Sequence, residues 1–194
     1  MTYRIEAIEL FVRETKPARA VFSLGKKGGG GDAKTKLISP LGHVRMVLKT
    51  SGGTETFGCS GDRLSVRWLD KRPGRSHGRK RRELVSLIET ARAVYLKHRE
   101  FASPFDHWRK CHALIMKAGR AADQEDLSSS FASALMERAM LDAVCRLSGK
   151  PLFQMVKADR LGFRPAAVHR ELGKLKFPQV LPARPNTALF IRHT

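Results

Sequence analysis

Cysteine, acidic residues and long apolar runs are all scarce in this sequence. Its three cysteines, Cys59, Cys111 and Cys145, lie far apart and no C-x-x-C pair occurs, which argues against a disulfide framework and a zinc ribbon. No apolar run approaches the roughly 20 residues that span a bilayer. The N-terminus, MTYRIEAIEL, lacks the apolar segment of a signal peptide. We therefore expect a cytoplasmic protein with reduced thiols and no membrane partner.

The charge of the chain is strongly one-sided. Lys and Arg number 37 whereas Asp and Glu number 18, so the formal net charge is +19. Such an excess attracts nucleic acid, anionic surfaces or anionic substrates, and the sign alone does not choose among them. Hydrophobic residues make up 42% of the 194 positions, which is enough for a buried core in one domain or slightly more.

Three segments near the N-terminus carry the pattern of β-strands. Residues 3–14, YRIEAIELFVRE, alternate with apolar side chains on both faces, and residues 43–50, HVRMVLKT, keep three apolar side chains in phase. A Ser-Gly-Gly turn at residues 51–53 leads into residues 54–59, TETFGC. Strands joined by so short a turn pair antiparallel. The sequence therefore predicts a three-stranded antiparallel meander.

Two amphipathic helices are predicted after the strands. Residues 83–100 carry apolar side chains at helical spacing. The next helix begins at Ser103 and Pro104, because a serine hydroxyl caps free N–H groups and proline suits the first helical position. Gly119 is expected to end this second helix. The basic stretch before residue 83 contains proline and glycine, so we expect it to be a loop.

A third helix and a short turn complete the predicted helical bundle. The serines at residues 128–130 are expected to cap this helix, and Gly149 ends it at the position that glycine favours. Pro151 begins a short fourth turn. Residues 159–194 contain four prolines and little periodicity, and only residues 187–194, TALFIRHT, have a strand pattern. The fold class is therefore α+β, a three-stranded antiparallel meander followed by a helical bundle.

The third helix and the residues after it carry a family pattern. Residues 134–156, ALMERAMLDAVCRLSGKPLFQMV, combine an alanine-rich helix, an aliphatic residue before Asp142, and Gly-Lys-Pro before an aliphatic turn. This stretch resembles the last helix of the N-terminal capping domain of the enolase superfamily, in its mandelate racemase and muconate lactonizing enzyme branch. The runs LISP (37–40) and HVRMVLKTSGGTETFGCSG (43–61) resemble the second and third strands of that domain. The resemblance covers residues 3–156.

The resemblance implies two domains with different roles. Residues 1–158 form the enolase-like capping domain, and residues 159–194 form a connector that ends on the first strand of a (β/α) barrel. A barrel takes about 250 residues, so we expect the protein to continue past Thr194. In this family the barrel binds Mg²⁺ through three carboxylates and uses Lys or His bases to remove the proton α to a carboxylate. The implied enzyme is a racemase, dehydratase or cycloisomerase, and its relatives are commonly homo-oligomeric.

Two loops of the capping domain contribute substrate contacts in this family. By resemblance they map to Phe22 and Ser23, just before a glycine run, and to Gly58, Cys59 and Ser60. The expected substrate is a small carboxylic acid. The glycine run itself, in SLGKKGGGGD, lacks the Gly-Lys-Ser/Thr order and the following helix that a P-loop needs. A flexible insertion behind an active-site lid is the preferred interpretation.

The sequence leaves two other functions open. Residues 71–82, KRPGRSHGRKRR, have Lys or Arg at seven of twelve positions, so the chain can be a basic nucleic-acid-binding module. No aromatic residue interrupts that run, which counts against single-strand binding by stacking, and a solvated surface loop is preferred. The second alternative is a non-catalytic, cap-like interaction protein, which predicts no further coding sequence.

Two further patterns have structural explanations that are preferred over a function. His107, Cys111 and His112 lie about one helical turn apart, a spacing that helical metal sites use. Neighbouring apolar residues place them toward a core, so packing is favoured and no metal ligand is predicted in this chain. Lys174-Leu175-Lys176 looks like the family's Lys-x-Lys base motif, but it precedes the predicted barrel strand. It is interpreted as part of a solvated loop.

Overall fold

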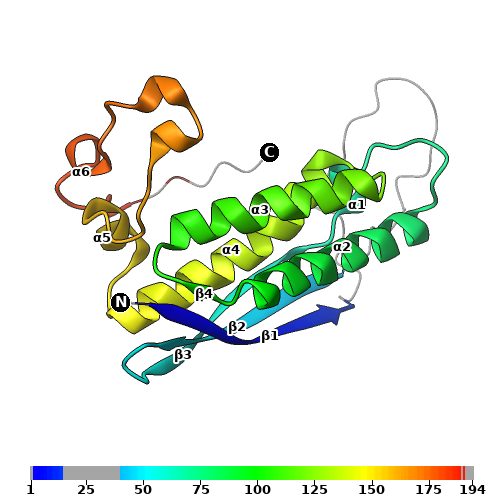
Figure 1. Ribbon diagram of the computed structural model, residues 1–194. Coiled ribbons are helices and arrows are strands. Elements are labelled where there is room, and N and C mark those ends of the chain that lie inside the picture. The colour runs from blue at the N-terminus through cyan, green and yellow to red at the C-terminus, as the bar shows by residue number, and fades with distance from the viewer. Residues whose placement is uncertain (1, 15–39, 189, 191–194) are drawn as a thin grey trace.

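An antiparallel β-sheet is covered on one face by helices (Figure 1). The computed structural model describes residues 2–14, 40–188 and 190. The strands are β1 (Tyr3–Arg13), β2 (Leu41–Thr50), β3 (Glu55–Arg63) and β4 (Glu100–Phe101). They lie in the order β3-β2-β1-β4, and all three pairings are antiparallel. The predicted α+β class and antiparallel sheet are confirmed, and β4 adds a fourth strand that was not predicted.

Helices α2 and α4 lie directly on the sheet, and α3 packs across both of them. The helices are α1 (Val66–Leu69), α2 (His77–Lys97), α3 (Pro104–Ala121), α4 (Asp126–Ser148), α5 (Leu152–Lys157) and α6 (Phe177–Val180). Two 3-10 turns, η1 (Pro165–Ala167) and η2 (Arg170–Leu172), separate α5 from α6. Within the described residues no helix is long and apolar enough to cross a membrane.

A β-bulge interrupts β1 between Ile5 and Ala7. These two residues pair with consecutive residues of β2, so Glu6 is left without a partner in that strand. An extra residue shifts the alternation of side chains by one position. Ile5 and Ile8 consequently both face the helices and are buried, although simple alternation places them on opposite faces of the strand.

Helix α2 begins at His77, inside the basic stretch that was predicted to be a loop up to residue 83. The hydroxyl of Ser76 accepts a hydrogen bond from the backbone N–H of Arg79 at 3.3 Å and so caps the helix. This cap offsets the cost of Gly78 in the first turn. The turn before it contains Gly74 at a φ of 69°, so only the first half of the basic stretch is a loop.

The predicted start of α3 is confirmed, because the Ser103 hydroxyl accepts from the N–H of Asp106 at 3.2 Å and Pro104 occupies the first turn. The predicted end at Gly119 is wrong, since α3 continues to Ala121. Gly119 is buried, and a side chain there would overlap the hydroxyl of Ser129 on α4. This glycine permits close packing of α3 and α4 instead of ending a helix.

Helix α4 begins earlier than predicted, at Asp126, and its serines do not cap it. Ser128 donates its hydroxyl hydrogen to the carbonyl of Leu69 at 2.9 Å, and Ser129 donates to the carbonyl of Glu125 at 3.2 Å. Both hydroxyls therefore donate to carbonyl groups from positions inside the helix, and neither accepts from a free N–H group at its start. The end of α4 is as predicted, with Gly149 in the left-handed conformation at a φ of 59°.

The hydrophobic core lies between the sheet and helices α2 and α4. Along α4 the fully buried positions are mostly small or flexible side chains, and they include Ala132, Leu135, Met136, Ala139, Met140 and Ala143. Small side chains allow a helix to approach a sheet closely, and methionine fills the irregular spaces that remain. The alanine-rich character of this helix is thus explained by its central position over β2 and β3.

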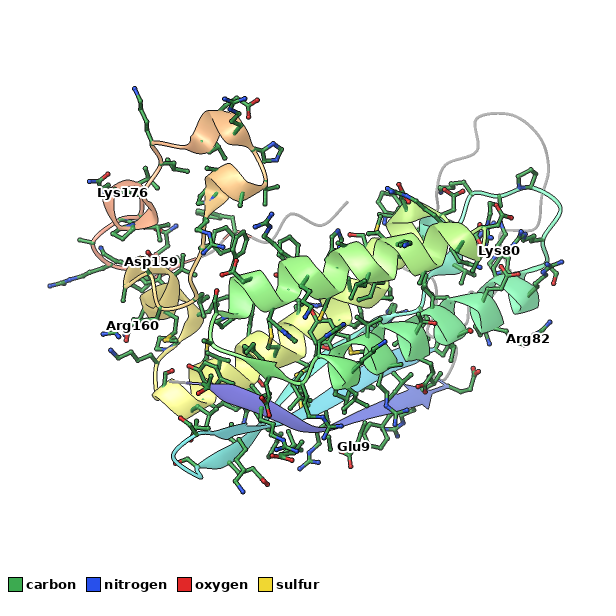
Figure 2. The ribbon with its side chains drawn as sticks, in the orientation of Figure 1. Glu9, Lys80, Arg82, Asp159, Arg160 and Lys176 are labelled. Atoms are coloured by element: carbon green, nitrogen blue, oxygen red, sulfur yellow. The ribbon has the colours of Figure 1, made fainter. Side chains whose placement is uncertain are left out.

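The residues after α5 stand beside the sheet and helix layers in Figure 1. They are joined to α3 by the ring of Phe163, 4.8 Å from that of Phe105, and by an ion pair between Arg164 and Asp106. The Lys-x-Lys motif lies in the turn and loop before α6, and Lys176, labelled in Figure 2, is exposed. Of residues 187–194, those that the structure describes are not in a strand. The barrel strand stays a prediction.

Candidate functional site

Gly58 lies in the middle of β3, where α4 packs on the strand. It is buried, and a side chain there would overlap the backbone of Ala139 and Ala143. Because backbone atoms cannot move aside as a flexible side chain can, only glycine allows this approach. In the structure Gly58 therefore has a packing role, and it lines neither of the two cavities described below.

Cys59 and Ser60 also connect β3 to α4. The backbone N–H of Cys59 donates to Asp142 Oδ2 at 2.8 Å, and the Ser60 hydroxyl donates to the carbonyl of Leu135 at 2.6 Å. The Asp142 that carried part of the family resemblance thus binds the backbone of the third strand. The other two predicted substrate-binding residues, Phe22 and Ser23, lie outside the described residues.

A cavity of about 340 Å³ lies just beyond these residues, at the end of β3. One wall comes from the end of the strand and from α1, and the other from the first turns of α4. Its lining consists of Asp62, Arg63, Ser65, Trp68, Leu69, Leu127, Ser130, Phe131 and Ala134. None of these residues was singled out as a binding residue from the sequence. The structure brings the two walls together although residues 70–126 separate them in the sequence.

The one-turn helix α1 explains why Trp68 faces the cavity. Val66 and Leu69 are buried against the core, each only 4% exposed, and the turn is closed by hydrogen bonds to the carbonyl of Ser65. With these side chains turned inward, Trp68 must point outward, and it is 67% exposed. The signal in the sequence was an apolar pair three residues apart with a tryptophan between them, which places the tryptophan on the opposite side of a helical turn.

The cavity combines aromatic and aliphatic walls with a small number of polar groups. Asp62 is held by Arg138 at 3.1 Å, so its charge is already balanced. Arg63 makes no side-chain hydrogen bond or ion pair with any described residue. The hydroxyls of Ser65 and Ser130 are the other polar groups. A free guanidinium beside hydroxyls and apolar walls suits the binding of a carboxylate that carries an apolar body.

The cavity lies at the end of the sheet where β1 and β3 finish and β2 begins. The register pairs Arg13 at the end of β1 with Leu41 at the start of β2, and Leu41 in turn with Arg63 at the end of β3. The connection between β1 and β2, which contains Phe22 and Ser23, therefore leaves and rejoins the sheet at this end. The first predicted substrate loop is thus attached where the cavity is found, whereas Gly58, Cys59 and Ser60, predicted to belong to a loop after the third strand, lie inside β3.

The basic segment 71–82 is largely occupied by internal ion pairs. Arg72 donates to both oxygens of Asp70 and to Glu83, and it also reaches the carbonyl of Asp123 at the start of α4. The other paired cations of the segment are Arg75, Arg79, Lys80 and Arg81, the last of which pairs with Glu14. In Figure 2 Lys80 and Arg82 lie on different sides of the first turns of α2. Most of the charge in this segment therefore holds the α1–α2 connection in place.

This network perturbs the pKa values of its acids. The hydrogen bond from Arg72 outweighs burial and lowers the pKa of Asp70 to about 2. Burial raises the pKa of Glu83, but hydrogen bonds from three arginines outweigh it and lower the pKa to about 2. The Asp70 side chain is only 4% exposed. These are the signs of a structural ion-pair network rather than of a catalytic base.

The predicted packing role of the histidines and Cys111 on α3 agrees with their contacts. His107 is buried, stacks on Phe101 at 4.4 Å and lies 3.7 Å from the Cys111 sulfur. Burial, with smaller effects from nearby cations, lowers the pKa of His107 to about 4, and burial raises that of Cys111 to about 12. Both groups are neutral at physiological pH. His112 hydrogen-bonds to Ser133 at 3.1 Å.

The residues that the structure describes hold no group of three or more His, Cys, Asp or Glu side chains placed to bind a metal ion. The Mg²⁺ implied by the resemblance therefore has no ligand set among them, and we assign it none. No family model matches this chain, and neither a curated protein nor a solved structure gives a match. The cavity at the end of β3 is the candidate functional site.

Proposed function

We propose that this chain is the substrate-capping domain of an enolase-superfamily enzyme. In this proposal it covers the mouth of a barrel and supplies binding contacts to a small carboxylic acid. The barrel supplies Mg²⁺ and the bases that remove the proton α to the carboxylate, and the reaction is a racemisation, dehydration or cycloisomerisation. The observation that carries the proposal is the composition of the cavity at the end of β3.

That cavity has groups for binding and lacks a group for proton abstraction. Arg63 offers a free cation, Ser65 and Ser130 offer hydroxyls, and Trp68 and Phe131 offer aromatic surface. No Lys or His occurs among its described lining residues, and its one acid, Asp62, is paired with Arg138. A site that binds without a base is what a cap needs when the reacting groups lie on another domain.

The position of the cavity is the second argument for the proposal. A cap covers an active site with loops, and the connection between β1 and β2, which the resemblance implies is one such loop, is attached at the end of the sheet where the cavity lies. Gly42 packs closely against the side chain of Leu64 at this end, so the start of β2 lies beside the residue that follows β3.

The nucleic-acid alternative loses its main support. Arg72, Arg75 and Lys80 of the basic segment are at most 18% exposed and are paired with acids. Buried and paired cations are not available to release counterions from phosphates. The reading frame after Thr194 distinguishes the interaction-protein alternative from the enzyme hypothesis, because only the enzyme requires a barrel there.

The first test is the reading frame after Thr194. We expect a barrel with Lys or His bases and three spaced carboxylates, and the absence of these residues would refute the catalytic part of the proposal. The second test uses the full-length protein with Mg²⁺ in D₂O and a panel of small carboxylic acids. Proton NMR should show Mg²⁺-dependent exchange of the α-proton in at least one acid.

Variants connect that activity to the cavity. Trp68→Ala should raise KM for the active acid at least about fivefold while kcat changes less, because the lost contact binds the substrate without reacting. Phe57→Ala is the matched control, since Phe57 is also an exposed aromatic residue, in the first half of β3, but does not line the cavity. Equal effects of the two substitutions on KM would argue against the cavity as the substrate site.

A further inference from the structure

A second cavity lies at the opposite end of the sheet from the candidate site. It has a volume of about 380 Å³ and is lined by Tyr3, Ala102, Ser148, Lys150, Met155 and Arg160. Tyr3 opens β1 and pairs with Thr50 and Phe101, whereas the candidate site lies near Arg13 at the other end of that strand. Nothing in the proposed capping function uses this cavity, and the inference below does not depend on that function.

The two cations of this cavity are positioned by the same backbone motif. Lys150 follows the end of α4, and Arg160 follows the end of α5. The residue before each cation has a left-handed backbone, with a φ of 59° for Gly149 and 51° for Asp159. The backbone N–H of each cation donates to the carbonyl five residues earlier, at 3.1 Å for Lys150 and 2.9 Å for Arg160. This is the Schellman motif, and it holds the backbone of both residues rigidly.

Asp159 adopts its left-handed conformation without being glycine. Such a conformation costs on the order of 1 kcal/mol and persists where the surroundings determine the backbone. Figure 2 labels Asp159 and Arg160 where the chain leaves α5. This left-handed residue immediately precedes Arg160, which lines the cavity.

The positive charge at this cavity is not balanced by the protein. Across residues 2–14 and 40–188, neither Lys150 nor Arg160 forms an ion pair or a side-chain hydrogen bond. No Asp or Glu is found among the described lining residues. The cations do complement the carboxyl ends of α4 and α5. That explains one charge at each helix end, but it does not explain why both charges share a cavity.

Tyr3 adds a hydrogen-bond donor to the cavity. Its side chain is 7% exposed and its ring stacks on Phe101 at 5.3 Å. Burial raises the pKa of its hydroxyl, which stays protonated at neutral pH. The hydroxyl makes no hydrogen bond with another described residue. The Ser148 hydroxyl, in contrast, already donates to the carbonyl of Val144 at 2.9 Å.

We propose that the cavity formed by Tyr3, Lys150 and Arg160 binds a phosphate group. Two unpaired cations match a dianion better than a single carboxylate, and a tetrahedral phosphate offers enough oxygens for an ammonium, a guanidinium and a phenol at once. A volume of about 380 Å³ holds inorganic phosphate or the phosphate end of a small ester. Binding weakens with added salt, because both cations are exposed to solvent.

The test is calorimetric titration of the full-length protein with inorganic phosphate and with glycerol phosphate, at constant ionic strength. We expect saturable binding that weakens at least about tenfold in the double variant Lys150→Met/Arg160→Met. Tyr3→Phe, which keeps the ring, should weaken it about three- to tenfold. Tighter binding of glycerol phosphate than of phosphate identifies a phosphate ester as the ligand, and equal binding identifies phosphate itself.

The matched control is Lys97→Met/Lys117→Met. It removes the same charge from exposed positions on α2 and α3 that do not line the cavity. This control should bind phosphate as the unchanged protein does. The proposal is overturned if the two double variants lose affinity equally, which would mean that only the overall charge attracts phosphate, or if no saturable binding occurs. Thermal melting of both variants checks that each is folded.

Discussion

Arg72 is the centre of the ion-pair network between α1, α2 and the start of α4, and its replacement by methionine tests that network. Arg72 Nε lies 2.9 Å from Asp70 Oδ1, and one terminal nitrogen lies 2.7 Å from Glu83. The side chains of Arg72 and Asp70 are 13% and 4% exposed. Methionine keeps most of the length of the side chain, so the change removes charge and hydrogen bonds with little loss of packing.

The expected loss follows from the charge that Arg72→Met leaves behind. Removing one partner of a buried ion pair costs about 3–5 kcal/mol, because the other charge stays buried and unpaired. Lys80 lies 3.7 Å from Asp70 and still offsets part of that charge. We therefore expect a loss of about 3 kcal/mol in the free energy of unfolding, and a Tm lower by roughly 6–12 °C for a chain of this size.

Urea unfolding followed by circular dichroism measures this loss. Because the folded pKa of Asp70 is about 2, below its ordinary value, the stabilisation is complete above about pH 4 and disappears as the pH falls through about 2. The difference between Arg72→Met and the unchanged protein should therefore be largest at neutral pH and shrink in acid. Asp70→Asn combined with Arg72→Met should cost less than the sum of the single changes.

Arg120→Met is the control for this experiment. Arg120 pairs with Asp126 at 2.9 Å, but both side chains are more than half exposed, so its loss should leave stability unchanged within error. A loss below about 1 kcal/mol for Arg72→Met would refute the reasoning, since it lies well under the cost of an unpaired buried charge. A difference that grows on acidification would refute it as well, because the sign of the Asp70 shift would be wrong.

Three further predictions concern packing, thiols and a helix end. Gly58→Ala should destabilise the protein by about 1–3 kcal/mol in thermal melts, because α4 must move, whereas Gly52→Ala, whose new methyl group would meet only the Thr50 hydroxyl at 3.8 Å, should not. Native alkylation should modify exposed Cys59 and spare buried Cys111, and mass spectrometry that finds Cys111 modified first would contradict the core. Gly149→Ala should cost about 1 kcal/mol in urea unfolding, and no loss would contradict its left-handed conformation.

Several elements could be predicted because their causes lie within a few residues. The Ser103-Pro104 start of α3 and the Gly149 end of α4 depend on hydrogen bonds to neighbouring turns. The β-bulge at Glu6 could not be found in this way, since it depends on the pairing of β1 with β2. The role of Gly119 could not be found in this way either. Judged from its neighbours alone, this glycine was expected to end a helix, but in the structure it makes room for Ser129 of α4.

The candidate site was located only in part from the sequence. The resemblance pointed to Gly58, Cys59 and Ser60, which the structure places against α4, a few residues before the cavity. Arg63 and Trp68, which line it, were missed. Their environment is completed by the first turns of α4, and nothing in the local sequence indicates which residues of a distant helix will face them.

Composition and periodicity by themselves determined the α+β class, the antiparallel strands and the positions of the main helices, because local hydrogen bonding and alternation of apolar residues encode them. The tertiary structure alone decided which charges are paired and where cavities lie. Cys59 and Asp142 are 83 positions apart, and Arg72 and Asp123 are 51 apart. Contacts over such separations depend on how the helices settle on the sheet, which is a property of the packed core as a whole.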